Sequence, residues 1–186
     1  MGSSLRSHLR APLYRDVLYL DEGHVLKCFG ANVSEGGILL GLFPHVPNIN
    51  LMPLLVEIPR YPLFSQMDKD EICHLKADTI PSEIVRMRGK IVRSFEGKSD
   101  IDKIFIQNIG CQFIDTDIAK KIIPDYINIF TANIVFLLGL FENSHRQEEQ
   151  IAVIRNISNI LGHKKDESLS ILRQKILHDY QSLKSN

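Results

Sequence analysis

Two short runs of strand-forming residues flank a glycine-containing turn in Val17-Leu-Tyr-Leu-Asp-Glu-Gly-His-Val-Leu-Lys-Cys-Phe29. The first run is Val17–Leu20 and the second is His24–Phe29, and both are rich in side chains that favour extended backbone. Asp21-Glu-Gly23 between them has the composition of a short hairpin turn, because glycine tolerates the positive φ that such turns need. This stretch therefore predicts an antiparallel β-hairpin.

Further strand-like segments follow the hairpin at short intervals, separated by prolines and polar residues. The strands that we expect cover Gly37–Phe43, Leu54–Ile58, Ile72–Ala77, Ile84–Phe95 and Lys103–Phe113. Between the second and third of these, Pro59–Met67 predicts an irregular connection and Asp68–Glu71 a solvated turn. Several short strands with turn signals between them favour a sandwich or a small barrel over a parallel βαβ sheet.

The segment that starts at Ile84 alternates most clearly between apolar and charged residues. Val85, Met87, Gly89 and Ile91 share one face, and Arg86, Arg88 and Lys90 share the other. Together with Arg93, these basic residues are also the composition of a nucleic-acid patch. The chain has 22 basic and 22 acidic residues and no net charge, so we favour a solvated strand face and expect no nucleic-acid binding.

From about Asp115 the apolar residues take helical spacing. Asp115-Thr-Asp117 offers N-cap residues, and Pro124 favours a helix that is interrupted or restarted there over one continuous rod. Ser144 and Gln147 form a capping-box signal for a helix that Gly162 ends, and Asp166 can cap a last helix. We therefore divide the chain into a β module, residues 1–127, and a helical extension, residues 128–186.

Composition limits the setting in which the protein works. The 44% of hydrophobic and 24% of charged residues are those of an ordinary globular protein and argue against disorder or a fibrous repeat. Three widely spaced cysteines, Cys28, Cys73 and Cys111, favour a reducing cytosol over a disulfide framework. The most apolar run, Ile134–Phe141, is too short to span a bilayer and no signal peptide is evident, so we expect a cytoplasmic protein without membrane insertion.

The usual catalytic signatures are missing from the sequence. It contains no GxSxG, P-loop, HExxH or GxGxxG motif, and its histidines lack metal-ligand spacing. Asp115 and Asp117 could bind a divalent cation, but acidic residues at a strand-to-helix junction more often cap the helix. We therefore expect no enzyme activity, no metal and no cofactor.

Two polar segments are harder to explain as structure alone. Arg6-Ser-His-Leu-Arg10 places two arginines four apart, and arginine forks suit phosphate oxygens and the O6/N7 edge of guanine. In Asn32-Val-Ser-Glu-Gly-Gly37, alternate residues of an extended chain put the Asn32 amide and the Ser34 hydroxyl side by side. Gly36 and Gly37 have no Cβ, so a flat ligand can approach the backbone. These are the components of a guanine-nucleotide site without a catalytic base.

The pair RxxxR and (D/N)xSxxG, in this order, resembles the double signature of the PilZ domain, a bacterial receptor for cyclic di-GMP. The matching residues are Arg6 and Arg10, then Asn32, Ser34 and Gly37. Gly89–Arg93 and Ile109–Phe113 are similar to the mid-barrel and last strands of that family, so the resemblance covers roughly residues 5–127.

The resemblance implies a mainly β fold, a six-stranded antiparallel PilZ-type barrel with the ligand on its outer surface, followed here by the α-helical extension. It makes Arg6 and Arg10 the clamps for phosphate and guanine, Asn32 and Ser34 the hydrogen-bonding pair, and Gly37 the residue that leaves room. Leu5 and Gly36 would be additional ligand contacts, and Leu5, which is not basic, favours one ligand molecule per site.

Three functions stay open on the sequence alone. The resemblance favours a cyclic di-GMP receptor that relays the signal to a partner. A PilZ-like interaction module that does not bind nucleotide is the alternative, although such members usually lose the arginines or the NxSxxG residues. A DNA-binding tail is the third, and the mixed charges of residues 144–186 argue against it.

The last helix carries one apolar stripe: Leu169, Leu172, Ile176, Tyr180 and Leu183. This stripe could pack back on Ile151, Ile154, Ile157 and Leu161 of the preceding helix. We favour helix-mediated self-association, most simply a two-fold dimer, or binding of a protein partner.

Overall fold

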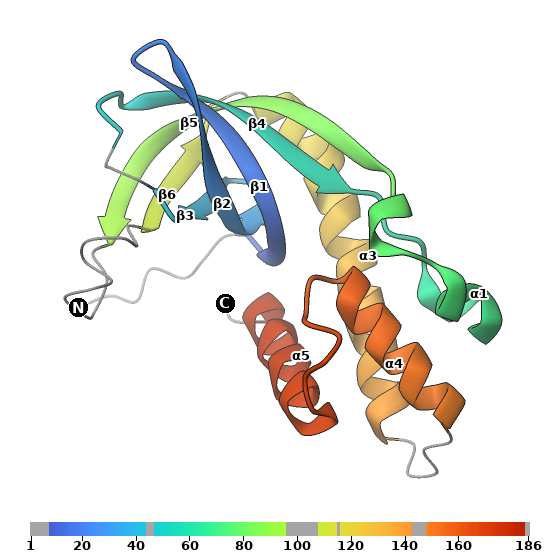
Figure 1. The fold of residues 1–186 in the computed structure, drawn as a ribbon. Coiled ribbons are helices and arrows are strands. Elements are labelled where there is room, and N and C mark those ends of the chain that lie inside the picture. Colours follow the sequence, from blue (N-terminus) through green and yellow to red (C-terminus); the bar gives the residue numbers. More distant parts are fainter. Residues whose placement is uncertain (1–7, 44–46, 96–107, 115, 143–147, 185–186) are drawn as a thin grey trace. The chain divides into compact units, whose positions relative to one another are not determined.

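The computed structural model describes residues 8–43, 47–95, 108–114, 116–142 and 148–184 (Figure 1). The chain divides into two compact units. The barrel unit contains Met1–Ile58 and Ser82–Asp125, and the helical unit contains Pro59–Pro81 and Tyr126–Ser185. Our division into a β module, residues 1–127, and a helical extension, residues 128–186, stays a prediction. In the structure, residues 59–81, which are inserted between two strands, belong to the helical unit.

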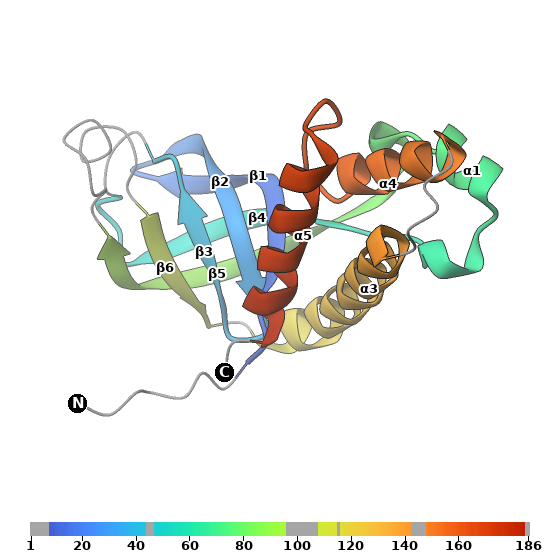
Figure 2. The same ribbon diagram turned by 90° about the horizontal axis from the view of Figure 1, so that it is seen from below.

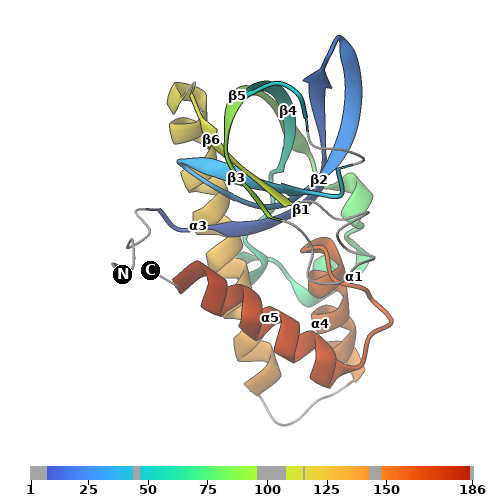
Figure 3. The ribbon, with the colours of Figure 1, turned by 90° about the vertical axis from the view of Figure 1, so that its left-hand side faces the viewer.

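Six strands form a closed barrel in the order β1-β2-β3-β6-β5-β4 (Figure 3). They are β1 (Ala11–Asp21), β2 (His24–Ser34), β3 (Gly37–Gly41), β4 (Leu51–Pro59), β5 (Ser82–Phe95) and β6 (Asn108–Phe113). Antiparallel pairing of β1 with both β2 and β4 closes the barrel. The six-stranded antiparallel barrel followed by C-terminal helices is therefore confirmed.

The predicted hairpin is the β1–β2 pair. Asp21 pairs with His24, so the loop consists of Glu22 and Gly23. Both loop residues have positive φ, 47° and 81°, which is the backbone of a type I′ turn. Gly23 thus lies at a position of the turn that requires positive φ.

The alternation along β5 is confirmed in the structure. Val85 and Met87 are buried in the barrel, whereas Arg86, Arg88 and Lys90 are exposed. The core of the barrel unit is built from large apolar side chains of the inner faces of the strands, among them Leu13, Tyr19, Leu40, Met52, Leu54 and Ile109.

The prediction of a strand over Ile72–Ala77 and of a turn at Asp68–Glu71 was wrong. The structure has helix α1 over Lys69–His74, between the 3-10 turns η1 (Phe64–Gln66) and η2 (Ala77–Thr79). Asp68 is the N-cap, and its backbone N–H donates to the Glu71 carboxylate at 3.1 Å. The Asp68-x-x-Glu71 spacing is a capping box, a helix-start signal that outweighs the short apolar run after it.

The expected break at Pro124 was also wrong, since α3 runs continuously over Thr116–Glu142. The missing N–H of proline leaves the carbonyl of residue 120 without its helical donor. Lys120 is exposed, so water can serve that carbonyl, and buried Ile123 and Ile127 continue the apolar face on either side of Pro124. By length and composition alone, Ala119–Glu142 could also cross a membrane, and 44% of its most apolar window is buried inside the protein. Absence of membrane insertion stays a prediction.

Two buried amides attach the inserted segment to the helices of the helical unit. Asn133 on α3 accepts a hydrogen bond from the Phe64 backbone N–H at 3.0 Å and donates one to the Pro62 carbonyl at 2.9 Å. Asn156 on α4 (Glu148–Ile160) donates to two carbonyls at the end of α1, at 2.6 and 2.7 Å. Figure 2 shows α1 beside α4. The segment that we expected to be an irregular connection is thus part of this unit's packing.

The predicted stop of α4 at Gly162 is confirmed. Gly162 has φ +103°, its N–H donates to the Asn159 carbonyl, and the His163 N–H donates to the Ser158 carbonyl, at 3.1 and 2.9 Å. This pair of bonds is a Schellman motif. The buried His163 ring then lies 3.0 Å from the buried Asp179 carboxylate of the last helix. The predicted capping residues Ser144 and Gln147 lie outside the described residues.

The last helix, α5, covers Leu169–Lys184. Its N-cap is Ser168, not Asp166: the Ser168 hydroxyl accepts from the Ile171 N–H and its carbonyl from the Leu172 N–H. On the predicted stripe Leu172, Ile176 and Leu183 are buried within the chain. The stripe is therefore occupied by intrachain packing, and self-association stays a prediction.

Candidate ligand-binding site

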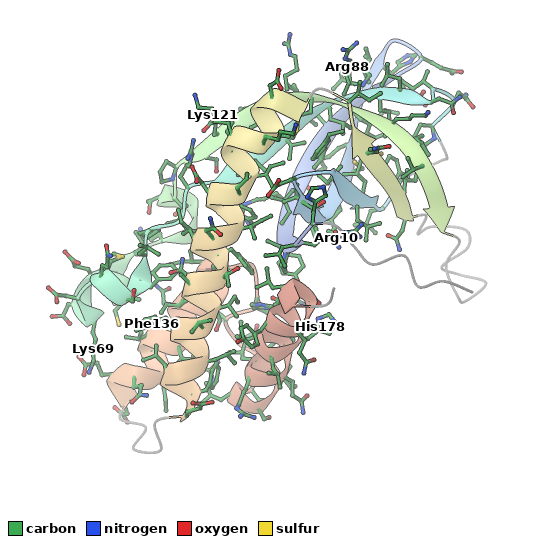
Figure 4. The ribbon with its side chains drawn as sticks, turned by 180° about the vertical axis from the view of Figure 1, so that it is seen from behind. Arg10, Lys69, Arg88, Lys121, Phe136 and His178 are labelled. Atoms are coloured by element: carbon green, nitrogen blue, oxygen red, sulfur yellow. The ribbon has the colours of Figure 1, made fainter. Side chains whose placement is uncertain are left out.

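The register of β1 on β2 brings the two polar segments together. Ala11 pairs with Val33 and Pro12 with Asn32, so the chain just before β1 runs beside the end of β2. Arg10 is half-buried at this point (Figure 4). Arg6 and Leu5 lie outside the described residues, so their predicted contacts stay predictions.

The outer face of β2 presents Asn32. Val33 is fully buried, and neighbouring residues of a strand point to opposite faces, so Asn32 and Ser34 lie on the outer side of the barrel wall. Asn32 is half-buried and can offer both a donor and an acceptor to a ligand edge. This placement agrees with the expected side-by-side amide and hydroxyl.

Ser34 has a structural contact that the sequence did not indicate. The whole residue is only 5% exposed, and its Oγ donates to the Gly37 carbonyl at 3.2 Å. The hydroxyl thus closes the turn between β2 and β3, where Ser34 pairs with Gly37. Its proton is used inside the protein, so only its oxygen lone pairs are left to accept from a ligand.

The packing of β3 against β6 requires glycine at position 37. A Cβ at this position would lie 2.2 Å from the Cys111 carbonyl oxygen, because β6 passes directly against β3. The neighbouring Gly36 carbonyl accepts the Phe113 N–H at 3.0 Å, which continues that contact. The close approach of two strands explains Gly37, where we expected room for the ligand.

Gly36 adjoins a residue that sequence reasoning missed. The His8 Cδ2 lies 3.0 Å from where a Gly36 Cβ would stand, and His8 Nδ1 lies 3.8 Å from the Glu35 carboxylate. A flat ring thus rests on the glycine backbone. His8 stands between the two motif arginines, so its position in the motif was the available signal.

A β-bulge in β1 adds a second unforeseen feature. Between the Pro12–Asn32 and Arg15–Gly30 pairs, β1 has one more residue than β2, and Tyr14 takes φ +50°. This backbone region costs a bulky residue about 1–3 kcal/mol. The Arg15 Nη1 donates to the Tyr14 carbonyl at 3.3 Å, and the Tyr14 ring stacks on Phe29 of β2.

The titratable groups inside the barrel are poorly suited to nucleophilic chemistry. Burial raises the pKa of both Cys28 and Cys111 to about 12, so neither thiol forms a thiolate near neutral pH. Burial also raises the pKa of Tyr19 to about 12. Over the part of the chain that the structure describes, no cluster of three His, Cys, Asp or Glu residues could hold a metal ion.

The basic face of β5 is separate from this site. Figure 4 shows Arg88 well away from Arg10, at the other end of the barrel unit in that view. Arg86, Arg88 and Lys90 alternate with core residues, as expected for a solvated strand face.

Comparison with known proteins gives similarity at the level of structure. No family model and no curated protein matches the chain. It is similar to the Bacillus subtilis inhibitor of motility MotI/DgrA, with 13% identity and a TM-score of 0.47, over 66% of this chain and 50% of that one. It is also similar to the PilZ domain of Escherichia coli YcgR, a structure with cyclic di-GMP, with 12% identity and a TM-score of 0.42, over 67% of this chain and 90% of that one. The chain thus spans about half the length of MotI/DgrA.

Proposed function

We propose that this chain, whose barrel is PilZ-like, is a bacterial cytoplasmic receptor for cyclic di-GMP without catalytic activity. The observation that carries the proposal is the β1–β2 register, which sets Arg10 beside the Asn32-x-Ser34-x-x-Gly37 segment on the outer surface of the barrel. A cationic fork next to an amide suits a phosphorylated guanine ligand.

The residues take distinct roles in this proposal. Arg10 and Arg6 would contact phosphate and guanine, and Asn32 would bind the edge of a base. Ser34 would accept from the ligand while its proton holds the turn, and Gly37 would keep the β3–β6 contact that supports the turn. Leu5 would favour a single ligand molecule, and Gly36 would be a further contact.

Titration calorimetry with cyclic di-GMP tests the proposal. Arg10→Ala should weaken binding about 10- to 100-fold, because a charge-assisted hydrogen bond contributes about 1.5–3 kcal/mol. Arg86→Ala, which removes an exposed arginine of β5, is the matched control and should bind as the parent does. A folded Arg10→Ala protein with parental affinity would show that Arg10 is not the clamp.

One observation favours the alternative of an interaction module that does not bind nucleotide. Ser34 and Gly37 are both explained by the β2–β3 turn and by β6, with no ligand needed. We place the receptor first because the sequence keeps both motif arginines together with Asn32, Ser34 and Gly37, and the β1–β2 register brings Arg10 beside that segment. If calorimetry detects no heat of binding when the parent protein is titrated with millimolar cyclic di-GMP, the interaction module is favoured.

We further propose that the signal passes to a protein partner or to a second copy of the chain through the helical unit. Because the α5 stripe is packed inside the chain, another surface of that unit would make the contact. Light scattering with and without cyclic di-GMP tests this: a change in mass on adding ligand supports a second copy.

A further inference from the structure

The outer wall of the barrel carries a stacked aromatic pair, Tyr14 and Phe29, to which the site described above gives no role. Tyr14 of β1 and Phe29 of β2 have ring centroids 6.3 Å apart and planes 20° apart. Both residues are half-buried. Two near-parallel rings from neighbouring strands form an aromatic platform on an outer surface that also exposes aliphatic side chains, among them Leu18 and Val25.

Phe29 shares the outer face with Asn32. A Cβ at Gly30 would meet the core side chains of Leu13 and Val17, so residue 30 faces inward and Phe29 outward. The register shift between Gly30 and Asn32 on β2 then lets both Phe29 and Asn32 face outward, although they are three residues apart. At roughly 3.3 Å per residue, they lie about 10 Å apart along the strand.

The bulge in β1 is what brings Tyr14 to this place. A bulky residue at φ +50° is strained, and strained backbone persists where the surrounding structure holds it. Arg15 helps to hold it through its bond to the Tyr14 carbonyl and brings a positive charge close to the platform. Farther along the two strands, Asp16 and Lys27 form an exposed ion pair at 3.1 Å. The aromatic surface therefore ends at these charged groups.

We propose that Tyr14 and Phe29 are ligand-binding residues, a stacking platform for a purine base of the ligand. The inference rests on the proposed function, since it extends the site from Asn32 along β2. Aromatic rings stack on a base without reading its edge, while Asn32 and Arg10 supply hydrogen bonds and charge. A ligand with two purine bases can engage the amide with one base and the platform with the other.

A fluorescence experiment tests the platform directly, because the chain contains no tryptophan. In Phe29→Trp the new indole is the sole tryptophan, and stacking on guanine should quench it in a saturable way as cyclic di-GMP is added. Val25→Trp is the matched control: Val25 is an exposed residue of the same strand and face, about 13 Å farther along, and its signal should not change. Quenching of both variants alike, or of neither, would overturn the proposal.

Affinity gives the second measurement. Phe29→Ala should bind roughly 5- to 100-fold more weakly than the parent, the range of alanine substitutions at stacked bases, and Phe29→Tyr should keep the parental affinity. Phe29→Leu retains the apolar bulk and should lose affinity like Phe29→Ala, which guards against a folding defect. If the parent binds and Phe29→Leu binds equally well, the platform is refuted while the receptor stands. If the parent does not bind, both proposals fail.

Discussion

Replacement of Gly37 by alanine tests why the motif contains glycine at this position. The new Cβ would stand 2.2 Å from the Cys111 carbonyl oxygen and 3.3 Å from the Gln112 Cα. An ordinary carbon–oxygen contact is about 3.3 Å, so β3 and β6 must separate by roughly 1 Å. Both obstacles are backbone atoms, which cannot rotate away as a side chain can.

The expected cost follows from those contacts. Overpacking costs about 1–3 kcal/mol, and weakening one or two bonds between β3 and β6 adds about 1–2 kcal/mol. Alanine returns about 0.5 kcal/mol by restricting the unfolded chain. We expect Gly37→Ala to lower the free energy of unfolding by about 2–4 kcal/mol.

Gly36→Ala is the matched control. Its Cβ would meet the half-exposed ring of His8 at 3.0 Å, and that ring can swing aside. We expect a cost below about 1 kcal/mol. Urea unfolding followed by far-UV circular dichroism measures both variants, and at a typical slope near 2 kcal/mol/M the midpoints should differ by about 0.5–2 M.

The explanation is refuted if Gly37→Ala is as stable as Gly36→Ala. Should Gly37→Ala keep parental stability and lose only cyclic di-GMP affinity, the glycine leaves room for ligand, as the family resemblance implied.

Other perturbations probe the rest of the chain. Asn156→Ala should destabilise the helical unit by about 1–3 kcal/mol, because it removes two hydrogen bonds of about 0.5–1.5 kcal/mol each, to the Ile72 and Leu75 carbonyls; thermal unfolding measures this. Iodoacetamide at pH 8 should modify Cys73 in the native protein well before Cys28 and Cys111, as mass spectrometry would show, and equal rates would contradict the inert barrel thiols. Since burial raises the pKa of those two thiols to about 12, the native state holds protons above pH 9 that the unfolded state releases, so stability should fall as pH rises from 9 toward 12.

Sequence patterns predicted an antiparallel sandwich or small barrel because the signals of strands and turns are local, and the family resemblance implied the six-stranded barrel. The Glu22-Gly23 turn and the alternation along β5 depend on neighbouring residues alone, and both are confirmed. The errors came where two local signals competed. At Asp68–Glu71 the charged residues suggest a solvated turn, but their spacing is that of a capping box that starts a helix. At Pro124 the continuous apolar face of α3 outweighs the hydrogen bond that proline cannot make.

Sequence reasoning named the candidate site residues, whose roles stay predictions, and did not foresee their contacts. The β1–β2 register, which brings Arg10 beside the Asn32–Gly37 segment, was not part of that reasoning. The contact of the His8 ring with Gly36 depends on the turn after β2. The Tyr14–Phe29 pair depends on the bulge in β1, and the periodicity of the sequence does not predict a bulge. Described contacts also changed the meaning of Ser34 and Gly37, from ligand contacts alone to parts of the barrel wall.

The manner in which Asn133 and Asn156 hold the inserted segment has a consequence for how this protein can vary. Both amides bind main-chain atoms of residues 62–75, a carbonyl or an N–H that nearly every amino acid supplies. Related chains could therefore replace most exposed side chains between β4 and β5 and keep the attachment, provided that the two asparagines stay. A library randomised over Lys69, Asp70 and Lys76 should yield mostly folded members, which makes this segment a place to graft new recognition onto the protein.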